Sequence, residues 1–131
     1  MSRLVLVVED EDDLRDIARF TLEGAGFEVI EAVNGLEGVT KSEAERPDLV
    51  LMDIQMPLLD GYEATRRIKA LPGMQRTPVV AVSSFAMKGD EEKARAAGCD
   101  AYVTKPYSPK QLLALVFLRR RNGAPEPCLT S

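Results

Sequence analysis

The stretch Leu49-Val50-Leu51-Met52-Asp53 decides the fold, because four consecutive apolar residues end there on a single carboxylate. A polar, turn-rich segment follows, from Ile54 to Gly61. A short apolar run bounded by turn signals is typical of a strand buried on both faces of a parallel sheet. Ligands of such sheets bind beyond the carboxyl ends of the strands. We therefore expect Asp53 to stand at a reactive edge.

Strand-like and helix-like segments alternate five times along the chain. Strand patterns cover residues 4–8, 27–32, 49–53, 78–82 and 100–104. The helix that follows each strand is given a start by a capping residue or a polar turn, and the expected caps are Asp12, Asn34, Asp60 and Ser108. This alternation predicts a doubly wound α/β fold. We expect a five-stranded, flavodoxin-like parallel sheet of order 2-1-3-4-5 with helices on both faces.

Length and composition limit the possible functions. The 131 residues suit one domain, assigned to residues 1–121, and the stretch 122–131 is expected to be a disordered tail. The formal net charge of -4 disfavours a nucleic-acid partner. No apolar run reaches the ~20 residues of a membrane span. The start shows no signal-peptide pattern, and Cys99 and Cys128 suggest no disulfide framework, so a cytoplasmic protein is expected.

The chain contains 0 histidines. This excludes Ser-His-Asp and Cys-His catalysis, histidine-ligated zinc and phosphohistidine chemistry on this chain. Any reaction must use carboxylates, lysine, hydroxyls, backbone groups or a hard metal ion.

Polar residues follow the apolar bodies of four strands: Glu9-Asp10, Asp53, Ser83 and Lys105. With the assumed strand order, all of them would line one edge of the sheet. Carboxylates held close together raise one another's pKa, and a divalent cation relieves that repulsion. Oxygen ligands favour Mg²⁺, with Mn²⁺ as a substitute. A carboxylate can also act as a nucleophile and form an acyl phosphate.

Each of these residues also has a simpler interpretation. The acidic run 9–13 could serve only to start a helix, and Asp53 could be a turn or cap residue. Ser83 could bond only to nearby backbone, and Lys105 could be a surface lysine. Their joint placement at successive strand ends favours a common site.

The chain resembles the receiver domains of two-component response regulators, from Leu4 to about Arg119. The resemblance is carried by several blocks in order, namely Val7-Val8-Glu9-Asp10, Leu51-Met52-Asp53-Ile54-Gln55-Met56-Pro57 with Asp60-Gly61, Ala81-Val82-Ser83-Ser84 and Lys105-Pro106. The stretches 86–90 and 97–102 are similar to receivers that work alone or in phosphorelays.

The resemblance implies a phospho-accepting switch. Asp53 would take a phosphoryl group from a phosphohistidine on a histidine kinase or histidine phosphotransfer protein. Glu9, Asp10, Asp53 and the backbone carbonyl of Gln55 would hold Mg²⁺. Ser83 and Lys105 would bind the phosphoryl oxygens, and the Lys105-Pro106 peptide would be cis. Such a protein would catalyse only its own phosphorylation and dephosphorylation.

The output would come from the face made by the fourth helix, fifth strand and fifth helix. Tyr102 would turn inward as Ser83 moves, and the alternative is that it is only a half-buried strand aromatic. Phe85 would shield the phosphoryl group from water, or simply pack on the fourth helix. Leu113 and Phe117, which are i,i+4 neighbours, could form a partner or homodimer face, or could belong to a wide core stripe.

Two rival functions share part of this pattern. A Mg²⁺-dependent phosphatase with an aspartyl nucleophile has the same chemistry, but such enzymes usually carry a second Asp where this chain has Gln55. A receiver-like binding module that works without phosphate would have no need of the acids, Ser83 and Lys105.

Overall fold

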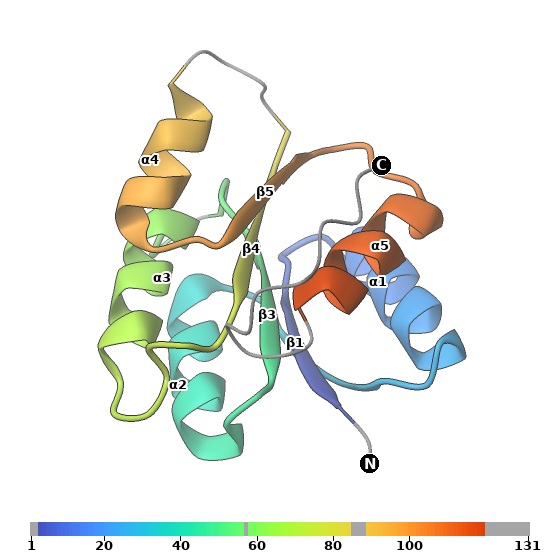
Figure 1. Cartoon of the computed structure of the whole chain (residues 1–131), viewed down its shortest axis with the longest axis horizontal. Coiled ribbons are helices and arrows are strands. Elements are labelled where there is room, and N and C mark those ends of the chain that lie inside the picture. Colours follow the sequence, from blue (N-terminus) through green and yellow to red (C-terminus); the bar gives the residue numbers. More distant parts are fainter. Residues whose placement is uncertain (1–2, 57, 85–88, 120–131) are drawn as a thin grey trace.

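The computed structural model describes residues 3–56, 58–84 and 89–119. Strands and helices alternate through these residues (Figure 1). The elements are β1 (Leu4–Val8), α1 (Asp12–Gly24), β2 (Glu28–Ala32), α2 (Gly35–Glu45), β3 (Leu49–Asp53), α3 (Gly61–Ala70), β4 (Val79–Ser83), α4 (Asp90–Ala97), β5 (Ala101–Thr104) and α5 (Pro109–Arg119).

The five strands form one parallel sheet of order β2-β1-β3-β4-β5, which confirms the predicted topology. β3 lies at the centre, between β1 and β4, and all its residues are buried. This burial on both faces of the sheet explains why residues 49–52 contain no polar side chain.

Helices cover both faces of the sheet (Figure 1). Helices α1 and α5 lie on one face, and α2, α3 and α4 lie on the other. Alternate strand residues feed the two cores: Leu51 packs with Leu22 and Leu112, whereas Met52 packs with the core under α3 and α4. Helix α4 contributes little to its core, because its only buried side chains are those of Ala94 and Ala97.

Three of the four predicted helix caps are confirmed. The side chains of Asn34, Asp60 and Ser108 accept hydrogen bonds from backbone N–H groups three residues later, at 2.8, 2.9 and 3.0 Å. Each satisfies one of the unpaired N–H groups that open a helix.

The cap predicted at Asp12 is wrong. Helix α1 begins at Asp12, and its capping position is Glu11, which makes no side-chain cap bond. The carboxylate of Asp12 instead pairs with the Arg15 guanidinium at 2.5 Å, one turn along the helix. An acidic side chain in the first turn still interacts favourably with the helix dipole, so this end remains stable without the cap.

The peptide bond between Lys105 and Pro106, just after β5, is cis, as predicted.

Two further observations concern the helices and the end of the chain. Within the described ranges, no helix has the length and apolar character that crossing a membrane requires. The boundary at residue 121 and the tail 122–131 lie outside the described residues and stay predictions.

Candidate functional site at the carboxyl edge of the sheet

Asp53 closes β3 at the carboxyl edge of the sheet, and only 3% of its surface is exposed. Helix α3 begins very close to it. A Cβ atom on Gly61 would lie 2.5 Å from the Asp53 carbonyl oxygen and 2.7 Å from the Ile54 Cα. Gly61 therefore permits the close approach that brings the start of α3 against the turn after β3.

Glu9 and Asp10 follow β1 and meet Asp53 at the same edge. One carboxylate oxygen from each of the three residues lies within 4.8 Å of the others. Glu9 is buried and Asp10 is exposed, so the cluster opens to solvent on the Asp10 side. The Arg15 guanidinium donates a 2.9 Å bond to the Glu9 carbonyl oxygen and so ties this turn to α1.

Lys105 follows β5 and reaches into the acidic cluster. Its Nζ lies 3.0 Å from Glu9 Oε1 and 3.4 Å from Asp53 Oδ2. The Lys105 N–H also donates a 2.7 Å bond to the Ser83 carbonyl oxygen, which fixes the backbone from which the side chain starts. The ammonium is thus shared between two buried carboxylates.

The protonation of the site follows from this burial. Burial raises the pKa of Asp53 to about 7, and the negative charge of Glu9 raises it too, against the opposing charge of Lys105. Burial lowers the pKa of Lys105, but its bond to Glu9 and the charge of Asp53 outweigh this, so the pKa is raised. The metal-free pocket therefore holds more negative charge than one ammonium neutralises.

We expect Asp53→Asn to raise the free energy of unfolding of the metal-free protein by about 2 kcal/mol at about pH 8. The folded protein binds a proton on Asp53 more tightly than the unfolded chain does, because the pKa rises from 3.8 to about 7. The parent consequently loses stability as pH rises through this window, and the variant does not. Urea denaturation in a chelator, across this pH range, measures the difference.

The matched control is Asp13→Asn, an exposed acid in the first turn of α1, whose effect should not change over the same pH window. The raised pKa of Asp53 is contradicted if Asp53→Asn is less stable than the parent at high pH. It is also contradicted if the difference in free energy of unfolding is the same at every pH.

Ser83, at the end of β4, is fully buried and lies beside Gln55. The Gln55 amide nitrogen donates a 2.9 Å bond to the Ser83 hydroxyl, and its amide oxygen accepts a 2.9 Å bond from the Ser84 N–H. The Gln55 N–H donates a 3.1 Å bond to Asp53 Oδ1. Sequence reasoning gave Gln55 a role only through its carbonyl oxygen and missed this side chain.

Tyr107 and Arg15 are two further site residues that the sequence did not indicate. Tyr107 lines a small space with Glu9 and Asp53, and burial, followed by the charge of Glu9, raises the pKa of its phenol. Its position two residues after Lys105 could have indicated that Tyr107 lies near the site. Arg15 occupied an ordinary helix position, and only the fold brings it under the Glu9 carbonyl.

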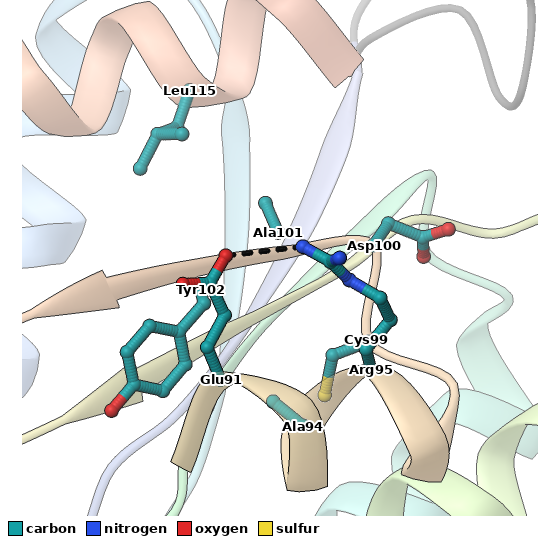
Figure 2. Close-up of a pocket in the computed structure, with 8 residues that line it drawn as sticks. All are labelled: Glu91, Ala94, Arg95, Cys99, Asp100, Ala101, Tyr102 and Leu115. Atoms are coloured by element: carbon teal, nitrogen blue, oxygen red, sulfur yellow. Dashed lines mark hydrogen bonds and ion pairs between the residues drawn. The ribbon is translucent and has the colours of Figure 1, made fainter. Parts of the chain in front are cut away.

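Tyr102 lies elsewhere, in a separate cavity of about 250 Å³. Figure 2 shows this cavity between α4, β5 and α5, with Leu115 on the α5 side and the Glu91–Arg95 ion pair along α4. Tyr102 is half-buried there and also packs against the core under α3 and α4. Phe85, the other predicted switch aromatic, lies outside the described residues.

The cluster of Glu9, Asp10 and Asp53 fits a hard divalent cation. Its donors are all carboxylate oxygens, and Asp10 leaves one side open for water ligands. Burial, followed by the charge of Glu9, raises the pKa of Asp53, and a bound cation would favour its ionised form.

A doubly wound sheet of this order, with an acidic cluster and a lysine at its carboxyl edge, defines the CheY-like class of flavodoxin-fold proteins. The chain belongs to the response regulator receiver domain family, whose model matches residues 5–117. Receiver domains are signalling switches rather than classical enzymes.

Curated relatives cover nearly the whole domain. The polar-differentiation response regulator DivK of Brucella anthropi is 41% identical over 116 residues, which are 88% of this chain and 94% of that protein. DivK of Brucella ovis is 40% identical over the same length and shares of the two chains.

Solved structures share the fold. The chemotaxis protein CheY4 of Vibrio cholerae has a TM-score of 0.86 at 26% identity, covering 89% of this chain and 98% of that one. The receiver domain of a sensor histidine kinase from Pseudomonas aeruginosa has a TM-score of 0.84 at 33% identity, covering 95% and 100%. That protein was crystallised with a magnesium ion coordinated in its active site cleft.

Proposed function

We propose that this protein is a phospho-accepting switch of a two-component system or phosphorelay, in which Asp53 takes a phosphoryl group from a phosphohistidine on a partner. The partner is a histidine kinase or a histidine phosphotransfer protein. The observation that carries the proposal is the placement of Asp53 at the sheet edge, with Glu9 and Asp10 oxygens within 4.8 Å and Lys105 Nζ at 3.4 Å.

The chemistry needs little from the protein beyond positioning and charge. A carboxylate oxygen of Asp53 attacks phosphorus, an O–P bond forms, and the N–P bond breaks with its electron pair leaving on the partner's imidazole. Lys105 and the Ser83 hydroxyl bind phosphoryl oxygens. Glu9, Asp10, Asp53 and the Gln55 carbonyl would hold Mg²⁺, which neutralises the developing charge when it is bound. Attack by water on the acyl phosphate resets the switch.

The output follows from the change of charge. Phosphorylation adds roughly -1.5 to -2 charge units at Asp53. Ser83, at the end of β4, is drawn toward the phosphoryl group. A shift between two populated states then changes the face made by α4, β5 and α5, where the cavity of Figure 2 lies. A downstream protein target binds that face, and Tyr102 within it reports the movement of Ser83.

The decisive experiment is incubation of the full chain with Mg²⁺ and acetyl phosphate, followed by intact-mass measurement. The parent should gain one phosphoryl group, and Asp53→Asn should gain none. Asp13→Asn, at an exposed acid outside the pocket, should behave as the parent does. Unchanged mass in the parent, or phosphorylation of Asp53→Asn, contradicts the proposal.

The phosphatase alternative gains nothing from the geometry. The position where such enzymes carry a second acid holds Gln55, whose amide is bound to Ser83 and Ser84. Steady turnover of small phosphomonoesters by the purified protein would be the result that favours that alternative.

Homodimerisation through α5 stays a prediction of the sequence. Phe117 is 42% exposed, but its ring packs at 5.5 Å, centroid to centroid, against Phe27 within the same chain. Leu113 is half-buried against the same core. Packing of α5 against Phe27 and its core gives both side chains contacts within one chain.

A further inference from the structure

The side chain of Gln55 joins two segments that phosphorylation is expected to rearrange. It starts from the turn after β3 and ends at the last residue of β4, where it contacts the Ser83 hydroxyl and the Ser84 N–H, each at 2.9 Å. Its own N–H remains on Asp53 Oδ1 at 3.1 Å. One residue thereby connects the acceptor carboxylate to the beginning of the segment that leads to α4.

The orientation of the Gln55 amide follows from chemistry. A backbone N–H can only donate, so the amide oxygen must face Ser84, and the amide nitrogen must then face Ser83. The Ser83 oxygen is therefore an acceptor in this contact, and its hydrogen points away from Gln55.

The Ser83 hydroxyl and the Ser84 N–H lie near the position where a phosphoryl group on Asp53 would need hydrogen-bond donors. Asp53 pairs with Val82 across the sheet, so Ser83 and Ser84 come directly after its neighbour in β4. The Ser84 N–H has one hydrogen, which can serve either the Gln55 amide oxygen or a phosphoryl oxygen. The phosphoryl oxygen is the stronger acceptor because it is charged.

We propose that the Gln55 side chain is a latch that holds the end of β4 in the unphosphorylated arrangement and releases Ser84 when Asp53 is phosphorylated. Gln55 is thus a positioning residue that sets how readily the switch turns on. This inference rests on the proposed function, because it takes Asp53 as the phosphoryl acceptor.

The test is a fluoroberyllate titration of the full chain in Mg²⁺, with the amide signal of Ser84 followed by NMR. Gln55→Met keeps the length of the side chain and removes both latch bonds. It should bind fluoroberyllate about threefold to fivefold more tightly than the parent, since about one net hydrogen bond no longer opposes the bound state. Gln55→Asn, whose side chain is one methylene too short to reach both partners, should shift affinity in the same direction.

A second readout needs no phosphoryl mimic. Without fluoroberyllate, the Ser84 amide hydrogen should exchange about threefold faster in Gln55→Met than in the parent, because its acceptor is gone. A role of Gln55 in folding alone would lower stability without tightening fluoroberyllate binding. Equal or weaker binding by both variants, or unchanged exchange at Ser84, overturns the latch.

The control is Gln75→Met, since the Gln75 amide binds the Leu71 carbonyl in a turn after α3 and should change neither readout. The two proposals fail differently. If the parent neither binds fluoroberyllate nor gains mass from acetyl phosphate, the phospho-accepting function and the latch both fall. If the parent does both and the Gln55 variants match it, only the latch falls.

Discussion

Lys105→Met is expected to lower the free energy of unfolding of the metal-free protein by about 3 kcal/mol at about pH 8. The substitution keeps most of the side-chain volume but removes the ammonium that lies 3.0 Å from Glu9 and 3.4 Å from Asp53. Two buried carboxylates would then face each other without a counter-charge. The loss should be read from urea or thermal denaturation in the presence of a chelator.

The stability lost in Lys105→Met should depend on pH. The pKa of Asp53, already about 7 in the parent, rises further when the ammonium is removed, so the variant takes up a proton at higher pH. The stability difference should therefore be largest above about pH 7 and should shrink toward acid pH, where a neutral Asp53 needs no partner. Mg²⁺ should restore part of the loss.

Lys110→Met, at an exposed lysine in the first turn of α5, is the control and should change stability little at any pH. A Lys105 variant as stable as the parent above about pH 7 would show that the pocket does not depend on this ammonium.

Gly61→Ala is expected to cost about 3 kcal/mol and to impair the site as well as the fold. The added methyl group would lie 2.5 Å from the Asp53 carbonyl oxygen, 2.7 Å from Ile54 Cα and 2.8 Å from Ile54 Cδ1. Two of these three atoms belong to the backbone, so the start of α3 or the end of β3 must move. A movement of the end of β3 would displace Asp53 from Lys105, and we expect phosphorylation by acetyl phosphate to slow together with the fall in stability.

Gly24→Ala is the matched control, because a Cβ there meets nothing within 4 Å and Gly24 is the last residue of α1. It should leave stability unchanged or slightly higher, since alanine favours a helix. If the two alanine variants behave alike, close approach at Gly61 does not hold the site together.

The sequence was sufficient for the architecture and for the main site. Continuous apolar runs such as 49–53 are sufficient to indicate strands buried on both faces, and a parallel sheet places the residues after those runs at one edge. This is why Asp53, Glu9 and Lys105 could be placed together before any coordinates. The cap pairs beginning at Asn34 and Asp60 are local in the chain, and these too could be predicted.

What the sequence could not supply depends on side-chain choices made only in the folded protein. Glu9 was expected to face a cation, yet its carboxylate also pairs with the Lys105 ammonium at 3.0 Å. The amide of Gln55 finds Ser83 and Ser84, which are remote in the chain. The Asp12 carboxylate could either cap the helix backbone or pair with Arg15 one turn later. The sequence pattern alone does not indicate which of the two forms.

Helix α4 buries few side chains in the core, and this affects how easily the helix can move. A helix anchored by two alanine methyl groups gives up only about 1 to 2 kcal/mol when it slides or tilts, whereas one anchored by leucines would give up several times more. We therefore expect α4 to shift more readily than the sheet beneath it, where every residue of β3 and β4 is buried. The exchange of one hydrogen bond at the end of β4 changes the free energy by about 1 kcal/mol. This is comparable to the free energy needed to reposition α4 and so to change the surface that it carries.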